Sequence, residues 1–330
     1  MEIGKISNDL LQSAIFDKNL HRRSEVKVRP NIGEDCSVLK FNHDEDIVLS
    51  TDPITGATKN IGKLAVHISC NDVSTSGAEP VGVLVTILLP PKTSEEEFKL
   101  IMDDIIETAH ENNIEILGGH TEVTDAVNRP LVSTTVVGKV KEDNMIATNG
   151  AIEGQDIILT KWAGLEGTSI LAYEYEEILS NEIGREYVMD GQNLGKHLSV
   201  VEESKVATKC KVTSMHDVTE GGVLGALWEI AQCANVGVSI NLDKIPVKEE
   251  TRAICDYFGI SPYKLISSGC MIMTTFQGEK CIEELSKLNI TANIIGKVTS
   301  KGQYMVKDGV KKEIEAPSSD DLYKALKKQI

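Results

Sequence analysis

The sequence has few aromatic residues, few basic residues and no long apolar run. Aromatic side chains make up 4% of the 330 residues, so the core must come mainly from Ile, Leu, Val and Ala. Lysine and arginine total 34 against 50 aspartates and glutamates, which gives a net charge of −16. Nucleic-acid binding needs a basic surface, so we expect no nucleic-acid partner. No apolar run reaches the ~18 residues of a membrane span, so we expect no membrane association.

Several enzyme signatures are also absent. The seven cysteines form no CxxC pair and several lie in apolar segments, which indicates reduced thiols and a cytoplasmic protein. The absence of HExxH argues against a catalytic zinc ion, and the absence of GxSxG argues against a covalent hydrolase. The glycine-rich turns, at residues 118–119, 164–167 and 221–222, match neither a P-loop nor GxGxxG. Each could still cradle a phosphate through backbone N–H groups, or simply be a tight turn.

Residues 64–80 predict a mostly buried helix that presents polar residues near its end. Apolar side chains recur at helical spacing up to Ile68, and Gly77 ends the helix. The same stripe carries Asn71 and Asp72 to the core or its edge. A buried carboxylate is costly unless it meets a cation or hydrogen-bond donors. Asp72 is therefore either a metal-site or phosphate-site residue, or an acid that caps or pairs within the fold.

Two acids flank a predicted β-hairpin near the N-terminus. Residues 36–41 and 46–52 predict two strands joined by a polar turn. Asp35 precedes the first strand and Asp52 ends the second. The outer ends of an antiparallel pair are neighbours in space, so the hairpin predicts that Asp35 and Asp52 lie close together.

Two further acids lie beside glycine. Glu122 ends GGHTE (118–122), which we interpret as a turn after a short strand, and His120 in it could bind a phosphate, carry a proton or only support the turn. Asp217 lies in HDVTEGGV (216–223), which echoes NDVSTSGA (71–78). Carboxylates suit Mg²⁺, and several converge only around a cation. The alternative is that these acids are unrelated turn and cap residues. The full set is Asp35, Asp52, Asp72, Glu122 and Asp217.

The order of the predicted elements favours an α+β protein of two domains. A linker-like segment at 149–156 divides the chain into residues 1–150 and 151–330. Each part mixes strands and helices. In the first part, residues 98–109 predict a helix that is capped by Thr93 or Ser94, with Glu96 and Glu97 in capping-box positions.

Four ordered motifs resemble the aminoimidazole ribonucleotide synthetase (AIR synthase) superfamily, and within it the hydrogenase maturation factors of the HypE type. They are GEDCSV (33–38), LAVHISCNDVSTSGAEP (64–80), GGHTE (118–122) and MHDVTEGG (215–222). The resemblance implies a homodimer in which N-terminal strands of both subunits form a shared barrel. It implies a C-terminal mixed sheet with flanking helices, and binding of ATP with Mg²⁺. A maturation protein could be a further partner.

The resemblance also implies roles for individual residues. The implied metal and phosphate ligands are Asp35, Asp52, Asp72 and Glu122, the last because His120 stands where related kinases have an acid. The implied nucleotide-binding residues are Gly118, Gly119, Thr121, Asn71 and Lys161. The implied catalytic residues are Asp72, Asp217 and His120.

The activity that the resemblance implies is the use of ATP to phosphorylate or activate an oxygen of a small acceptor. HypE proteins modify a cysteine at their own C-terminus, whereas this sequence ends LYKALKKQI, so we expect no such reaction on its own tail. The alternatives are a small-molecule kinase similar to thiamine-monophosphate kinase, a purine-pathway cyclo-ligase, and a nucleotide-binding regulator or maturation partner without turnover.

Overall fold

The computed structural model describes residues 4–5, 8–29, 38–54, 59–142, 144–317 and 319–327. The chain divides into two compact units, the first of residues 1–74 and 78–145 and the second of residues 75–77 and 146–330. Each unit combines a sheet with helices, so the predicted α+β, two-domain fold is confirmed. No helix in the described ranges is long and apolar enough to cross a membrane.

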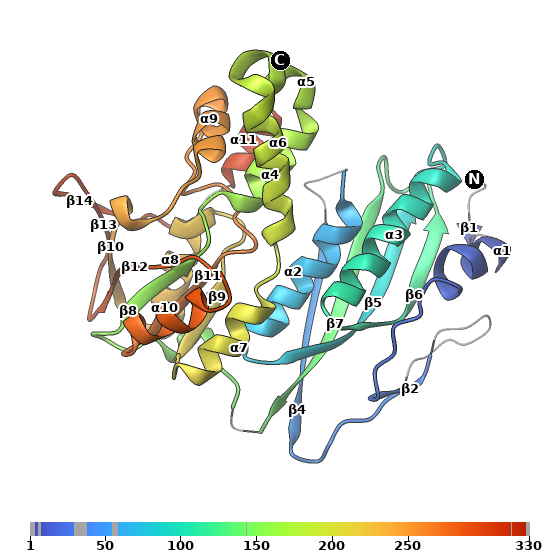
Figure 1. Cartoon of the computed structure of the whole chain (residues 1–330), viewed down its shortest axis with the longest axis horizontal. Helices are drawn as coiled ribbons and strands as arrows, with labels where there is room; N and C mark the ends of the chain where they lie inside the picture. Colours follow the sequence, from blue (N-terminus) through green and yellow to red (C-terminus); the bar gives the residue numbers. More distant parts are fainter. Residues whose placement is uncertain are drawn as a thin grey trace. The chain divides into compact units, whose positions relative to one another are not determined.

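The first unit is built on a five-stranded sheet of order β1-β6-β5-β7-β4. The pairs are antiparallel except for β5 with β6, which are parallel. Helices α2 and α3 lie over one face of this sheet (Figure 1). The elements are β1 (Gly4–Lys5), α1 (Asn8–Leu11), η1 (Gln12–Phe16), β4 (Glu45–Ile54), α2 (Ile61–Thr75), β5 (Glu79–Leu89), α3 (Glu95–Glu111), β6 (Glu115–Val123) and β7 (Leu131–Lys141).

Helix α2 confirms the buried helix predicted from its apolar stripe. Hydroxyl groups attach it to the sheet, because Thr134 Oγ1 of β7 donates to the Ala65 carbonyl at 2.7 Å and lies 2.8 Å from Ser69 Oγ. Gly138 of β7 lets the end of α2 pack closely against the strand, because a Cβ at this position would lie 2.3 Å from Val73 Cγ1. Helix α2 is therefore fixed against β7 from Ala65 to Val73.

The predicted hairpin over residues 36–52 is wrong. β3 (Val38–Leu39) pairs with β2 (Val26–Val28) in a separate two-stranded sheet, and β4 pairs along its whole length with β7. β4 has ten residues, and the two residues of β3 cannot provide a partner of that length. Asp35 lies outside the described residues, and its predicted closeness to Asp52 loses its basis in a hairpin.

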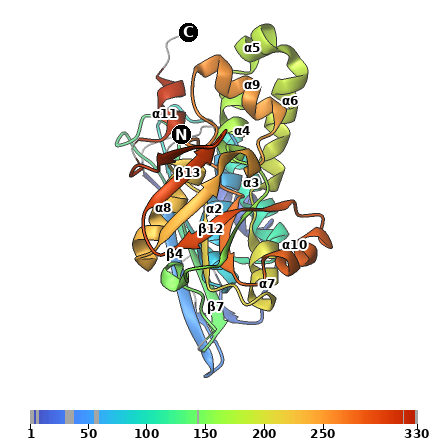
Figure 2. The same cartoon turned by 90° about the vertical axis from the view of Figure 1, so that its left-hand side faces the viewer.

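The second unit is built on a seven-stranded mixed sheet of order β14-β13-β10-β12-β8-β11-β9, part of which faces the reader in Figure 2. Only β10 and β13 pair in parallel. Its strands are β8 (Asp156–Thr160), β9 (Ser214–Asp217), β10 (Gly237–Asn241), β11 (Met271–Thr275), β12 (Ala292–Thr299), β13 (Gln303–Lys307) and β14 (Val310–Glu313).

Helices flank this sheet, and its core includes buried side chains of β8, β11, α7 and α10. The helices are η2 (Thr148–Gly150), α4 (Leu165–Glu174), α5 (Glu176–Leu179), η3 (Ser180–Gly184), α6 (Arg185–Asn193), η4 (Leu194–His197), α7 (Val201–Lys209), α8 (Gly222–Ala234), η5 (Leu242–Lys244), α9 (Glu249–Phe258), α10 (Gly278–Ser286) and α11 (Asp321–Leu326). Six cysteines lie in described parts of the chain, and all are free thiols. Five are buried, whereas Cys233 of α8 is exposed.

Candidate functional site

Asp72 and Asp52 lie on the same side of the first unit's sheet. Asp72 of α2 is partly buried, and the Ser50 hydroxyl of β4 donates a hydrogen bond of 2.5 Å to its Oδ2. Side chains alternate in exposure along β4, with Ser50 and Asp52 less exposed than Thr51 and Pro53. Ser50 and Asp52 therefore both face α2, about 7 Å apart along the strand. This arrangement places two carboxylates and a hydroxyl group in one neighbourhood.

Asn71 is fully buried in α2, directly before Asp72. The pKa of the neighbouring Cys70 thiol is affected by the charge of Asp72. Burial is the main reason that its pKa lies above the usual range, and the negative charge of Asp72 adds to the effect. Within α2, the amide group is thus enclosed while the adjacent carboxylate reaches the partly exposed side beside β4.

The GGHTE segment is not a turn, which corrects the sequence prediction. Residues 118–122 form the second half of β6 and pair in parallel with β5. Gly119 has a φ of +146°, and a Cβ there would lie 1.8 Å from the Val85 carbonyl oxygen. Glycine at this position therefore allows the two strands to pair closely.

His120 and Glu122 form an exposed pair on the opposite face of the sheet from Asp52. His120 Nε2 lies 3.1 Å from Glu122 Oε2, and the two side chains are 45% and 37% exposed. His120 pairs with Thr86, which pairs with Ser133, which pairs with Pro53. Paired residues point to the same face, and Pro53 faces away from α2.

A single chain therefore does not bring Glu122 to the Asp52–Asp72 pair. Besides the opposite faces, β5 and β7 lie between β6 and β4, which corresponds to about 14 Å of interstrand spacing. Thr121, between His120 and Glu122, pairs with Ile87 of β5. Among the described residues, no group of three or more His, Cys, Asp or Glu side chains could hold a metal ion.

In the second unit, Asp217 ends β9 and is buried, with 4% of its surface exposed. Its Oδ2 has no hydrogen-bond partner. His216 Nδ1 donates to the Asp217 carbonyl at 2.6 Å, and its Nε2 lies 3.3 Å from Glu229 Oε2. Burial disfavours the charged imidazole, but the hydrogen bonds to Asp217 and Glu229 prevail and raise the pKa of His216 to about 10. His216 is therefore a cation at neutral pH.

The echo between residues 71–78 and 216–223 has no counterpart in local structure. Asp72 lies inside a helix, whereas Asp217 ends a strand that leads through Gly221 into α8. The two segments therefore share a sequence pattern but not a local structure.

Lys161 lies at the end of β8 and is buried in the second unit. Its ammonium group donates to the carbonyls of Ser199 at 2.6 Å and Gly269 at 2.9 Å, and it pairs with Glu203 at 2.5 Å. All three of its N–H donors thus have protein partners. Burial raises the pKa of Glu203, and the nearby positive charge of Lys161 opposes this rise.

Two buried residues of the second unit were missed from the sequence. Glu166, in the first turn of α4, and Ser268 each have a side-chain oxygen without a hydrogen-bond partner. Glu166 lies within the Gly164–Gly167 turn, which the sequence marked only as a possible phosphate cradle. The available signal was an acid between two glycines ahead of an apolar helix.

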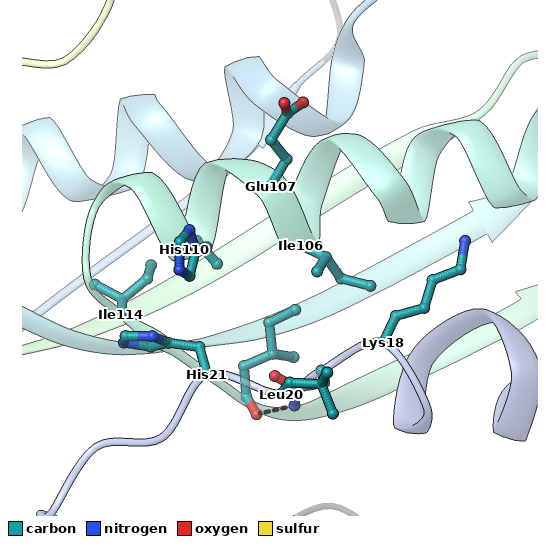
Figure 3. Close-up of a pocket in the computed structure, with 10 residues that line it drawn as sticks. Lys18, Leu20, His21, Ile106, Glu107, His110 and Ile114 are labelled. Carbon is teal, nitrogen blue, oxygen red and sulfur yellow. Dashed lines mark hydrogen bonds between the residues drawn. The ribbon is translucent and has the colours of Figure 1, made fainter.

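A cavity of about 230 Å³ lies elsewhere in the first unit, beside α3. Figure 3 shows His21 and His110 near each other at one end of it, and their rings are 5.5 Å apart in a T-shaped contact. Much of the lining is apolar, including Leu20, Ile106 and Ile114. None of the site residues predicted from the sequence lines this cavity.

Both parts of the chain match models of one protein family. The N-terminal domain of AIR synthase related proteins matches residues 33–140, and the C-terminal domain matches residues 153–309. A protein of Methanocaldococcus jannaschii that is named as a hydrogenase expression/formation protein is 28% identical over 338 residues, which covers 97% of this chain and 96% of that protein.

Solved structures share the fold. The hydrogenase maturation protein HypE in complex with ATP superposes with a TM-score of 0.77 at 21% identity, covering 97% of both chains. A thiamine-monophosphate kinase (ThiL) complexed with AMPPCP and TMP has a TM-score of 0.68 at 18% identity, covering 94% of both chains. At these identities the likeness concerns the fold alone.

Proposed function

Because the chain belongs to the AIR synthase related family, we propose that it is a Mg²⁺-dependent enzyme that uses ATP to phosphorylate or activate an oxygen of a small acceptor. The observation that carries this proposal is the Ser50–Asp72 hydrogen bond, with Asp52 on the same face of β4. The HypE structure that shares this fold was determined with ATP, which supports the choice of nucleotide.

The donor set on α2 and β4 fits Mg²⁺. Asp52, Asp72 and Ser50 offer only oxygen atoms, and Mg²⁺ is commonly held by one or two carboxylates together with water and substrate phosphates. When bound, Mg²⁺ would neutralise charge on the transferring phosphoryl group. Ser50 would orient the Asp72 carboxylate. Asp35 stays a proposed ligand, and Glu122 would join the site only from a second chain, because one chain holds it on the opposite face of the sheet.

We propose that the nucleotide contacts the β6 segment and the α2 helix. Gly118 and Gly119 offer backbone without side-chain bulk, and Thr121 offers a hydroxyl group. Asn71 and Lys161 were also proposed as nucleotide-binding residues, and both are buried. We therefore assign them a supporting role, in which Lys161 joins the end of β8 to α7 and to Gly269.

Asp217 and His120 are the further catalytic residues that we propose. The buried Asp217 carboxylate has one oxygen without a hydrogen-bond partner, and this oxygen can accept a hydrogen bond from a substrate bound beside it. His120 is exposed in the single chain and pairs with Glu122, on the face where we propose that the dimer forms, so a ligand would reach it at the dimer interface.

We propose that the protein is a homodimer that forms through the open face of the first unit's sheet. Ile47, Leu49 and Leu84 expose 57%, 64% and 38% of their surfaces. Ile47 and Leu49 alternate with the α2-facing residues of β4, so they share the uncovered face. Exposed apolar patches of this kind mark interaction surfaces. The free cysteines are consistent with the cytoplasm, where we place the protein.

We propose that the acceptor is a component of hydrogenase maturation. The relative from Methanocaldococcus jannaschii is named as a hydrogenase expression/formation protein, and it matches nearly the whole chain. A maturation protein would then supply or receive the activated group. Two alternatives stay open. One is a kinase for a phosphomonoester such as thiamine monophosphate, which the shared fold of the kinase structure supports. The other is a nucleotide-binding maturation partner without turnover.

The proposal is tested by calorimetry and by product analysis on the full chain. ATP is titrated with and without Mg²⁺, and ADP release is then measured with water, simple amides, phosphomonoesters and thiamine monophosphate as acceptors. Tight Mg²⁺-dependent binding and acceptor-stimulated ADP release support the enzyme. Stimulation by thiamine monophosphate alone favours the kinase. Tight binding with no ADP release from any acceptor would favour the non-catalytic partner.

A further inference from the structure

Besides Glu203 Oε1, which forms an ion pair with Lys161, three buried side-chain oxygen atoms among the described residues of the second unit have no hydrogen-bond partner. They are Glu166 Oε2, Asp217 Oδ2 and Ser268 Oγ. The three residues expose 3%, 4% and 0% of their surfaces. Buried polar atoms are normally satisfied, because an unmade hydrogen bond inside a protein is costly. Three unsatisfied oxygens in neighbouring residues indicate a place that receives a hydrogen-bond donor from outside the chain.

The fold brings these residues together through the segment 265–270. The Gly164 N–H donates to Ser267 Oγ at 2.6 Å, and the Gly167 N–H donates to the Ile266 carbonyl at 3.0 Å. The first turn of α4, which contains Glu166, therefore lies against this segment. Backbone bonds between residues 218 and 267 and between residues 218 and 270 hold the end of β9, with Asp217, against the same segment. Ser268 lies within it.

A third nearby acid shows that burial alone does not leave carboxylates unsatisfied here. Asp320 is also buried, yet its carboxylate accepts from the N–H groups of Gly221 at 2.7 Å, Leu322 at 2.7 Å and Ile266 at 3.2 Å. It joins the chain before α11 to the start of α8. The same region thus satisfies a structural acid completely while Glu166 and Asp217 keep free oxygens.

The charges around Glu166 favour a carboxyl group that can gain and lose a proton near neutral pH. Burial raises its pKa to about 7, and the negative charges of Asp320 and Asp217 act in the same direction, whereas the nearby Ser268 opposes them. Next to Asp217 stands the cationic His216, which is itself paired with Glu229.

We propose that Glu166, Asp217 and Ser268 bind a hydrogen-donating group of the acceptor, an amide or a hydroxyl, and that Glu166 takes its proton. This inference rests on the proposed function. In the reaction, the acceptor oxygen forms a bond to the γ-phosphorus of ATP, and the bond from that phosphorus to the β–γ bridging oxygen breaks. ADP leaves with the electron pair. The acceptor's proton passes to the Glu166 carboxylate and then to solvent.

The test uses the full chain and follows ADP release between pH 5 and pH 9, with water and then acetamide as acceptor. Glu166→Gln keeps the size of the side chain and removes its basicity. We expect it to slow ADP release about 100-fold and to leave the calorimetric ATP affinity unchanged, which is the size of effect typical of a lost general base. Glu166→Asp should retain part of the rate. The control is Glu177→Gln, an exposed residue of α5, which should stay within twofold of the wild type.

The pH profile separates proton transfer from a structural role. The wild-type rate should rise through a pH limb near 7, and that limb should vanish in Glu166→Gln. Ser268→Ala should lower the rate about tenfold while keeping the limb, and it serves as the second variant if Glu166→Gln fails to fold. Unchanged ADP release in Glu166→Gln overturns this inference alone. Absence of ADP release by the wild type with every acceptor overturns the proposed function and this inference together.

Discussion

The Ser50 hydroxyl on β4 donates a 2.5 Å hydrogen bond to the Asp72 carboxylate on α2. This contact fixes the acid that the sequence marked as unusual within a mostly buried helix. A carboxylate that a hydroxyl holds in place, with a second carboxylate on the same strand face, is suited to bind a hard cation. The Ser50–Asp72 pair is therefore the first place to test the proposed activity.

Asp72→Asn should lower ADP release by about 100-fold or more with little loss of stability. The amide still accepts the Ser50 hydrogen bond, but it lacks the negative charge that Mg²⁺ and phosphates require. The measurement is steady-state ADP release at saturating ATP, with the thermal unfolding midpoint as a check of folding. Asp46→Asn, an exposed acid on β4, is the matched control and should keep full activity. Equal rates for both variants would remove Asp72 from the site.

Gly119→Ala should destabilise the first unit by about 3 kcal/mol or more. The new Cβ would lie 1.8 Å from the Val85 carbonyl oxygen, so β5 and β6 would have to separate. Urea unfolding measures the loss. Gly309→Ala is the control, because nothing lies within 4 Å of a Cβ there and only its positive φ costs about 1 kcal/mol. Similar losses at both positions would show that the close pairing of β5 and β6 is not what requires glycine.

Local signals predicted the helices of the first unit well. The apolar stripe before Asn71 gave α2, and Ser94 with Glu97 forms the capping box that begins α3. These signals act within one or two turns of chain, so the sequence alone contains them. Strand pairing, by contrast, joins residues that are far apart in the chain, so local signals do not determine it. β4 pairs with β7, whose residues lie more than 75 positions away, and the polar turn before it suggested a hairpin that does not form.

The candidate site was predictable only in part for the same reason. Asp72 stood out because a polar residue interrupts an apolar stripe. The role of Gly119 did not, since a glycine that opens a turn and a glycine that admits a neighbouring strand look identical in sequence. Glu166 was missed because nothing near it in the chain indicates that Asp217 and Ser268 come to lie beside it. Burial of an acid follows from contacts across the fold.

Lys161→Met should destabilise the second unit by about 3–5 kcal/mol, because it leaves the Glu203 carboxylate buried without its cation. Double replacement of Lys161 by Met and Glu203 by Gln should recover much of this loss. The control is Lys205→Met, which breaks an exposed pair with Glu202 and should cost less than about 1 kcal/mol. Urea unfolding gives the energies. A loss of ATP affinity in Lys161→Met without a loss of stability would instead assign the ammonium group to the nucleotide.

Leu49→Arg should convert the proposed dimer into a monomer, since it places a charge in the middle of the uncovered sheet face. Sedimentation velocity measures the change in mass. Leu100→Arg, at a similarly exposed leucine of α3, is the control and should leave the assembly unchanged, because α3 covers the other face. A monomeric wild type would contradict the dimer directly.

The stability of the protein should fall between about pH 4.5 and pH 8 because of Glu166. Its pKa rises from 4.5 to about 7 on folding, chiefly through burial, so the folded state holds a proton that the unfolded state releases. Protonated Glu166 therefore contributes stability that is complete below pH 4.5 and is lost as the pH rises through about 7. The difference between these two pKa values corresponds to about 3 kcal/mol.

Glu166→Gln should remove this pH dependence, because the amide does not titrate. At pH 8 the variant should be more stable than the wild type, and at pH 5 the two should be nearly equal. Urea unfolding at both pH values measures the free energies, and Glu177→Gln should follow the wild-type curve. A variant that is more stable yet slower in ADP release would show that the unsatisfied acid is kept for chemistry at the expense of stability. Parallel stability curves for wild type and Glu166→Gln would show that Glu166 is ionised across the whole range.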